Sequence, residues 1–249
     1  MSGTSPFPNL PISQALIPTT PLTLQAYSYI NQHTSEATRH HVLRSASFAM
    51  LLARKFPPLA TANLDVEAVA LSAILHDMGW ATTKSLLSSD KRFEVDGANI
   101  ARTFIQSSAQ DPWDKHRLQL VWDAIALHTT ASIAHHKEPE VLATQLGIMA
   151  DFFGPNLPIP GNLITVEEYK EIVHAFPRSN FKNELIHIMC GLCRDKPQTT
   201  FDNFVSDFGV IYGLDGHGTG KEDFLKSVQD SNISKLLVGG LEACAEHEL

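Results

Sequence analysis

A histidine and an aspartate, His76 and Asp77, stand side by side at the end of an apolar run of the sequence. A carboxylate on an otherwise apolar face is costly unless a positive charge compensates it. A divalent cation is the simplest compensator, because imidazole and carboxylate are both good ligands for zinc, iron and manganese. Taken alone, the two residues are more often a capping histidine beside a solvated aspartate. A metal centre therefore requires further ligands elsewhere in the chain.

The helix that leads to this pair is predicted to begin after Asp65, which is a typical N-cap residue, and to end at Gly79. Apolar residues recur along it every three or four positions and continue up to His76 and Asp77. The pair is therefore expected at the C-terminal end of a buried helix.

Two further helices each offer one ligand. His41 lies on a helix predicted over 35–56, which is packed through small residues and ends at consecutive prolines. Asp151 lies on a helix predicted over 138–153, on a face whose small residues allow another helix to approach closely. Together with the central pair, these residues give three helices that each offer a metal ligand.

The remaining sequence also favours an all-α fold, because no segment shows the alternation of a strand. The prolines and serines of 1–21 predict an extended N-terminal arm that lies on the domain, or a loose tail. We predict a single helical domain over 22–249, with its core at about 35–155 and a helical C-terminal extension over 162–249. Further helices are predicted over 95–108, 114–128, 166–176 and 180–194.

Composition limits the compartment and the partners. The 19 Lys and Arg residues are scattered among 27 Asp and Glu residues, so the net charge of −8 speaks against a nucleic-acid partner. Three cysteines make no disulfide framework, and the N-terminus lacks the pattern of a secretory signal. The apolar stretches are too short to span a membrane. We expect a cytoplasmic protein with a small-molecule substrate and no membrane partner, and the apolar pattern of 138–153 permits a homodimer.

The order of a helical His, a His-Asp pair and a distant helical Asp resembles the HD-domain superfamily of all-helical metalloenzymes, over roughly residues 35–155. The resemblance implies an HD-domain helical bundle around a buried metal site. It also implies that the metal ligands are His41, His76, Asp77 and Asp151. We expect one divalent metal, with Zn²⁺ as the first choice and Fe²⁺ or Mn²⁺ as alternatives, since nitrogen and oxygen donors accept all three.

Two positions depart from other members of that superfamily. Members with two metals carry a further His four residues before a Gly-Ala step, and here Phe93 precedes Gly97-Ala98. A phenyl ring cannot ligate a second metal, so one metal is expected. Phosphohydrolase members often have a Lys three residues after the Asp, where this chain has Trp80. An indole makes that end of the pocket uncharged, which suits a small neutral substrate.

Longer stretches look like the fungal and yeast cyanamide hydratase group, whose members are zinc proteins that add water to the nitrile of cyanamide to give urea. The stretches that carry this resemblance are 41–44, 74–79, 92–98 and 176–178. The resemblance implies a hydratase (hydro-lyase) for a small neutral substrate with a C≡N bond. The chain departs from the group after His128, where hydroxyl side chains begin at Thr129. The substrate within this class is therefore left open.

The resemblance also suggests roles around the metal. Asp77 would be both a ligand and a base for a water molecule, and His128 matches a pocket histidine that would pass a proton to the substrate nitrogen. Trp80, Phe93 and Thr129 would line the substrate cavity. Without the resemblance, a lone histidine such as His128 on an apolar helix face is usually a satisfied core residue.

Two other functions stay open at this point. The first is a metal-dependent phosphohydrolase that acts on nucleotides or phosphate esters, for which Lys84, Lys91 or Arg92 would have to reach the site. The second is a binding protein without enzymatic activity, in which the metal only stabilises the helical shell. That function predicts that replacement of His128 has no effect.

Three other features are interpreted from their local sequence. Arg44, one turn after His41, either pairs with a buried carboxylate or lies exposed. Cys190 and Cys193 have no second Cys pair and are predicted to be core residues. The glycine-rich run after Asp215 lacks the spacing of a phosphate-binding loop and predicts a flexible turn.

Overall fold

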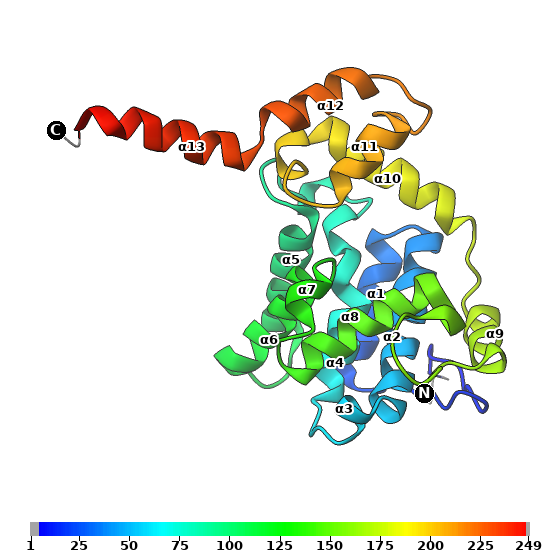
Figure 1. The fold of residues 1–249 in the computed structure, drawn as a ribbon. Coiled ribbons are helices and arrows are strands. Elements are labelled where there is room, and N and C mark those ends of the chain that lie inside the picture. Colours follow the sequence, from blue (N-terminus) through cyan, green and yellow to red (C-terminus); the bar gives the residue numbers. More distant parts are fainter. Residues whose placement is uncertain (1–4, 248–249) are drawn as a thin grey trace. The chain divides into compact units, whose positions relative to one another are not determined.

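The computed structural model describes residues 5–247, which contain helices and no strand (Figure 1). The all-α fold expected from the sequence is confirmed. The α-helices are α1 (Pro21–His33), α2 (Glu36–Lys55), α3 (Pro57–Ala60), α4 (Val66–Leu75), α5 (Phe93–Ser108), α6 (Lys115–Ala126), α7 (Ala131–Ala134), α8 (Pro139–Phe153), α9 (Val166–Ala175), α10 (Phe181–Asp195), α11 (Val205–Tyr212), α12 (Lys221–Asp230) and α13 (Ile233–Cys244). Short 3₁₀ helices are η1 (His76–Trp80), η2 (Lys84–Leu86), η3 (Gly154–Asn156), η4 (Pro197–Thr199) and η5 (Ala245–His247).

The chain divides into two compact units, Met1–Phe181 and Lys182–Leu249. The sequence-based division differs from this one, since it placed 22–249 in a single domain with an extension from 162. The boundary between the units falls after the first residue of α10. Helical periodicity continues through this point without a change of composition, so the local sequence gives no sign of a boundary.

Helix α4 forms the centre of the first unit. It packs against α1, α2, α5, α6 and α8, and every residue from Ala68 to Leu75 is buried. Asp65 caps its start by accepting a hydrogen bond from the backbone N–H of Ala68. The regular α-helix ends at Leu75, and the tighter η1 continues it through the His-Asp pair. The pair therefore lies at the end of the buried helix, as predicted.

Two close helix contacts fix the elements around this end. Helices α2 and α8 pack along each other, and a side-chain carbon at Gly147 would overlap with Ala49 and with the backbone of Ser45. A side-chain carbon at Gly79 in η1 would likewise overlap with the backbone carbonyl of Phe93 at the start of α5. Glycine at these positions lets the backbones touch, which brings the ligand-bearing helices together.

The N-terminal arm lies on the first unit over its described part. Phe7, Leu10 and Ile17 are buried. The carboxylate of Glu171 in α9 accepts hydrogen bonds from the backbone N–H groups of Ile12 and Ser13. Residues 5–20 therefore form an ordered covering of the first unit, while residues 1–4 of the predicted arm lie outside the described part of the chain.

The second unit contains its own small core, in which α11 packs against α12. A side-chain carbon at Gly209 would overlap with the ring of Phe224 and approach the sulfur of Cys193. Cys190 and Cys193 are buried, as expected of core residues. After α11, the predicted turn is held by the Asp215 carboxylate, which accepts hydrogen bonds from Thr219. No helix in the described range has the length and apolar character needed to cross a membrane.

Candidate metal centre

His41, His76 and Asp77 each direct one ligand atom to a common point inside the first unit. The Nε2 atoms of the two histidines are 3.2 Å apart, and the Oδ2 atom of Asp77 lies 3.3 Å from one and 3.1 Å from the other. All three side chains are at most 1% exposed. Helix α2 supplies the first residue and η1 the other two. These residues form a group that could hold one metal ion.

The position of the proton on each imidazole ring leaves the atoms at the centre suited to bind a cation. The Nδ1 atom of His41 faces a carboxylate oxygen of Asp151 at 2.6 Å, and the Nδ1 atom of His76 faces the carbonyl oxygen of Ala73 at 2.8 Å. Both partners accept hydrogen bonds, so each ring carries its proton on Nδ1 and presents a lone pair at Nε2. Two lone pairs and a carboxylate at about 3 Å repel one another unless a cation lies between them.

Asp77 provides a second, independent indication. Both of its carboxylate oxygens are buried and have no hydrogen-bond partner. Buried polar atoms are rarely left without a partner, because the desolvation is then not compensated. A metal ion is the partner that this donor set selects. The residues present therefore fit a divalent metal held by His41, His76 and Asp77.

The structure does not bring Asp151 into this group. Its carboxylate lies on the opposite side of the His41 ring from the ligand atom, where it accepts the Nδ1 proton. The expectation from the sequence that Asp151 is a fourth ligand is therefore not reproduced in this arrangement. Both of its oxygens are engaged by neighbouring donors on α2, and we assign to it the orientation of His41. Carboxylates in such positions fix the tautomer and raise the basicity of a metal-binding histidine.

Arg44 explains why Asp151 is held away from the centre. Its guanidinium donates from Nε to one oxygen of Asp151 at 2.6 Å and from NH2 to the other at 2.9 Å. The NH1 atom donates to the carbonyl oxygens of Phe176 and Pro177. Of the two roles considered for Arg44, pairing with a buried carboxylate is the correct one. Burial alone would raise the pKa of Asp151, but its bonds to His41 and Arg44 hold that pKa well below its usual range.

His128 lies beside the centre, directly after α6. Its Nδ1 atom donates to the carbonyl oxygen of Ile125 at 2.7 Å, which leaves a lone pair on Nε2. Nε2 lies 4.0 Å from Oδ1 of Asp77, and the ring packs edge-on against His76. Burial, followed by the proximity of His76, lowers the pKa of His128 from 6.5 to about 4. His128 is therefore a neutral imidazole with a free acceptor that faces the metal-binding aspartate.

Aromatic rings form the wall on this side of the centre. Trp80 stacks on Phe93 with ring centres 5.2 Å apart, and the edge of Phe93 meets His128 at 5.7 Å. The indole Nε1 of Trp80 is buried and has no hydrogen-bond partner. A phenyl ring, which cannot ligate a metal, thus lies beside His128. Within residues 5–247, no second group of three metal-binding side chains was found.

The predicted wall residue Thr129 faces a polar neighbour that sequence reasoning did not assign. It donates a hydrogen bond to Glu94 at 2.7 Å, and Arg92 pairs with the same carboxylate at 2.9 Å. Glu94 is only 1% exposed. Its sequence position, between a loop and a helix, allowed either a rim residue or a helix cap. The buried acidic side chain beside a threonine and an arginine became visible only in the folded chain.

Sequence reasoning also missed Phe181. Its ring stacks on the His41 imidazole with centres 4.3 Å apart and an interplanar angle of 18°. Together with the bond to Asp151, this contact fixes the plane of the ring. A lone phenylalanine at the start of a predicted helix carries no local signal for such a role, because the contact spans a long stretch of sequence.

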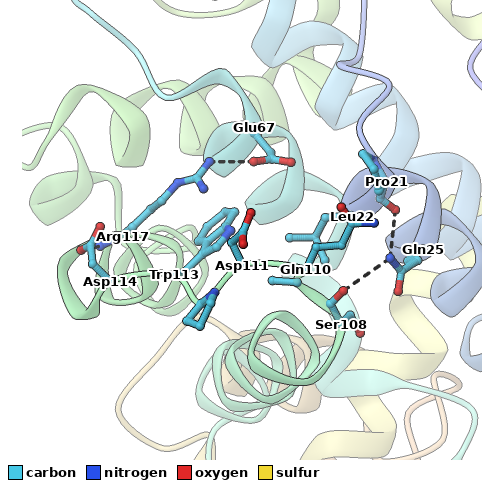
Figure 2. A pocket seen from close by; sticks show the side chains of 12 residues that line it. Pro21, Leu22, Gln25, Glu67, Ser108, Gln110, Asp111, Trp113, Asp114 and Arg117 are labelled. Atoms are coloured by element: carbon cyan, nitrogen blue, oxygen red, sulfur yellow. Dashed lines mark hydrogen bonds and ion pairs between the residues drawn. The ribbon is translucent and has the colours of Figure 1, made fainter.

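A surface cavity of about 300 Å³ lies in the first unit between α1, α4 and α6 (Figure 2). Figure 2 shows Arg117 reaching past Trp113 toward Glu67; its guanidinium lies 3.4 Å from the centre of the indole ring and pairs with the carboxylate at 2.7 Å. Arg117 also pairs with Asp65. None of the residues that line the cavity belongs to the metal-binding group. The cavity is therefore a separate surface feature whose arginine is already paired.

The segment that carries the metal-binding group was compared with known protein families. Residues 38–152 match the HD domain family. This segment contains the histidine of α2, the His-Asp pair of η1 and the aspartate of α8. The matched segment therefore includes the helices that carry the group that could hold a metal ion, and its all-α structure is consistent with an HD-type helical bundle. A comparison with curated proteins gave no match. The finer resemblance of this HD segment to cyanamide hydratases rests on the sequence alone.

The low pKa of His128 predicts that the metal-free protein loses stability in mild acid. An unfolded imidazole titrates near 6.5 and the folded one near 4, so the unfolded chain binds more protons between these values. The free energy of unfolding should therefore fall by about 3 kcal/mol as the pH drops from 6.5 to 4. Urea unfolding of chelator-treated protein at a series of pH values measures this slope. His128→Gln should show a shallower slope; equal slopes would contradict the assignment.

Proposed function

We propose that the chain is a metal-dependent enzyme that adds water to a small neutral substrate with a C≡N bond, as in the conversion of cyanamide to urea. Proteins with an HD domain are generally metal-dependent hydrolases, and the match over 38–152 supports metal-assisted attack by water. One observation carries the proposal: the group of His41, His76 and Asp77 lies beside a neutral His128 and an aromatic wall.

A neutral substrate is favoured because the arginines next to the centre are already paired. Arg44 is bound to Asp151, and Arg92 is bound to Glu94. Lys91, one of the three residues considered for phosphate binding together with Lys84 and Arg92, pairs with the exposed Asp90. A phosphate ester would need such cations for its own oxygens. The uncharged stack of Trp80 on Phe93 instead suits a compact molecule without charge.

A divalent metal held by His41, His76 and Asp77 would supply a Lewis acid that lowers the pKa of a bound water molecule. Whereas Oδ2 of Asp77 is the oxygen close to the two imidazole ligand atoms, its Oδ1 atom lies 4.0 Å from Nε2 of His128. This separation is too long for a direct hydrogen bond and fits one shared water or substrate atom between them. Asp77 can thus orient the attacking water while its other oxygen is a ligand.

His128 can then move the proton that the reaction displaces. Attack of water oxygen on the nitrile carbon forms a C–O bond and breaks one of the C≡N π bonds, and the nitrogen needs a proton. The Nε2 lone pair of His128 can accept a proton from the attacking water and return it to this nitrogen. Movement of the hydroxyl proton to nitrogen completes the amide. His128 ends the cycle neutral, with its Nδ1 proton on the Ile125 carbonyl throughout.

The buried indole of Trp80 supports the same substrate class. Its Nε1–H lacks a partner within the protein, so it can donate a hydrogen bond to a nitrogen or oxygen of a bound molecule. A single donor of this kind, in an otherwise aromatic wall, recognises a small polar molecule without requiring a charge.

The proposal is tested by offering purified, metal-loaded protein two groups of compounds. We expect urea to form from cyanamide, and little phosphate to be released from nucleoside mono- and bisphosphates. His128→Gln should lower kcat for urea formation by about 10²-fold or more, since a positioned proton carrier contributes this much. His135→Gln, which changes a histidine that hydrogen-bonds Gln145, is the matched control.

Each alternative function predicts a different result. Release of phosphate at enzymatic rates without urea formation would favour the metal-dependent phosphohydrolase. Metal binding without turnover of either group, unchanged in His128→Gln, would favour the binding protein. Urea formation that is unaffected by His128→Gln would leave the hydratase but remove its proton carrier.

A further inference from the structure

Helix α13 presents an apolar face that the other described elements of the second unit leave uncovered. The face, here called the α13 stripe, consists of residues at helical spacing: Ile233, Leu236, Leu237, Gly240, Leu241 and Cys244. Its four large side chains are between 63% and 71% exposed. The only described element with which α13 makes extensive contact is its own continuation, η5. An isolated helix of 12 residues is marginal in water, so the stripe needs a cover.

We propose that the α13 stripe pairs with the same stripe of a second copy of the chain, with the two helices antiparallel. The stripe is symmetric about a point between Val238 and Gly239. A two-fold axis at this point places Leu237 opposite Gly240 and Ile233 opposite Cys244. In these two pairs a large side chain meets a small one, as knobs fit holes in paired helices, while Leu236 meets Leu241 in an apolar contact between them. A side chain at Gly240 would have no neighbour within 4 Å, so this hole is open.

The area of the stripe agrees with a small, specific dimer. Four side chains with these exposed fractions offer roughly 500 Å² in each copy, so two copies would bury roughly 1,000 Å² in total, which is near the lower limit of specific interfaces. The apolar residues of α8 that suggested a homodimer from the sequence are not available for this purpose. Val141, Leu146 and Ile148 are buried within the first unit, where α8 packs against α2, and of the large apolar residues of α8 only the last two, Phe152 and Phe153, are exposed.

The charges of α13 favour a second copy over a membrane surface. The polar side of the helix carries Lys235 and Glu242, and the stripe itself has no charged residue. Helices that bind anionic membranes usually carry several basic residues on the polar side. One lysine balanced by one glutamate supplies no such attraction. An uncharged stripe with complementary large and small positions is instead suited to its own copy.

Sedimentation velocity over roughly 1–100 µM protein tests the dimer. We expect the dimer fraction of the unchanged chain to rise with concentration. Leu237→Glu should remain monomeric over the whole range, because pairing would bury a carboxylate without a partner. Lys235→Glu, on the other side of the helix, should dimerise as the unchanged chain does. A chain that is monomeric throughout, or Leu237→Glu that dimerises equally, overturns the proposal; binding to anionic vesicles by a monomeric chain would assign the stripe to membranes.

Mild oxidation tests the antiparallel arrangement. Ile233→Cys should form a disulfide-linked dimer, since the new thiol faces the second copy's Cys244. The two Cys244 residues would lie ~16 Å apart, beyond the reach of a disulfide, so the unchanged chain should not cross-link. Adding Cys244→Ser to Ile233→Cys should abolish the link. Burial raises the pKa of Cys190 and Cys193, so these thiols should not compete. Efficient cross-linking of the unchanged chain would overturn the antiparallel pairing.

Discussion

His41→Ala will purify with about a tenth of a metal ion per chain or less, where the unchanged protein carries about one. The substitution removes one of the three atoms that converge within 3.3 Å. The two remaining ligands, His76 and Asp77, are too few to retain the ion. Asp77 is then left buried with no cation and no hydrogen bond. Elemental analysis of purified protein measures the ratio directly. Activity should fall by about 10³-fold or more, because the activation of water depends on the metal.

The neighbouring histidine offers a matched control. His40 lies on the same helix, and its ring faces the carbonyl oxygen of Pro177 rather than the centre. His40→Ala should therefore retain the metal and most of the activity. If both variants lose the metal to the same extent, the loss reflects damage to α2 and not removal of a ligand. A ratio near two in the unchanged protein would contradict the single-metal centre inferred from Phe93.

Arg44→Met will lower the free energy of unfolding by about 3–5 kcal/mol, the usual cost of removing one partner of a buried ion pair. Arg44 and Asp151 are both fully buried, and the guanidinium binds both carboxylate oxygens. Arg44→Lys should rescue only part of the loss, because an ammonium cannot donate in the same planar, two-pronged arrangement. Urea unfolding monitored by circular dichroism measures each variant.

A double substitution separates the two roles of this pair. Arg44→Met combined with Asp151→Leu removes both charges, and replacement of a buried pair by apolar residues is often close to neutral. Most of the stability should return. His41 would still lack its oriented Nδ1 partner, so metal affinity should be lower by about 10–100-fold than in the unchanged protein. Recovery of stability together with full metal affinity would show that Asp151 does not orient His41.

The roles of the aromatic residues Phe93 and Trp80 were inferred partly from the sequence and partly from the tertiary structure. Phe93 and Trp80 were singled out because they replace residues expected in other branches of the superfamily. The structure adds that the two rings stack on each other and that Phe93 also touches His128. It also shows an unpaired indole N–H, which no sequence pattern reveals. The substrate class proposed above thus combines a sequence comparison with a contact that only the folded chain makes.

The sequence by itself determined the all-α class, most of the long helices of the first unit and three of the residues at the centre. Helical periodicity and end signals are local properties, so α2, α4, α8 and their neighbours were found close to their actual bounds. The His-Asp pair was identifiable because a charged residue at the end of an apolar helix has to be compensated. His41 was identifiable from its order in the chain.

Tertiary structure decided how the ligand shell is completed. Asp151 was expected to be a metal ligand, yet its carboxylate is bound by Arg44 and by the Nδ1 atom of His41. This arrangement depends on the contact between α2 and α8. The stacking of Phe181 on His41 and the division of the chain within α10 have the same origin. Such features come from contacts between residues distant in sequence. Periodicity, which compares only residues a few positions apart, carries no information about them.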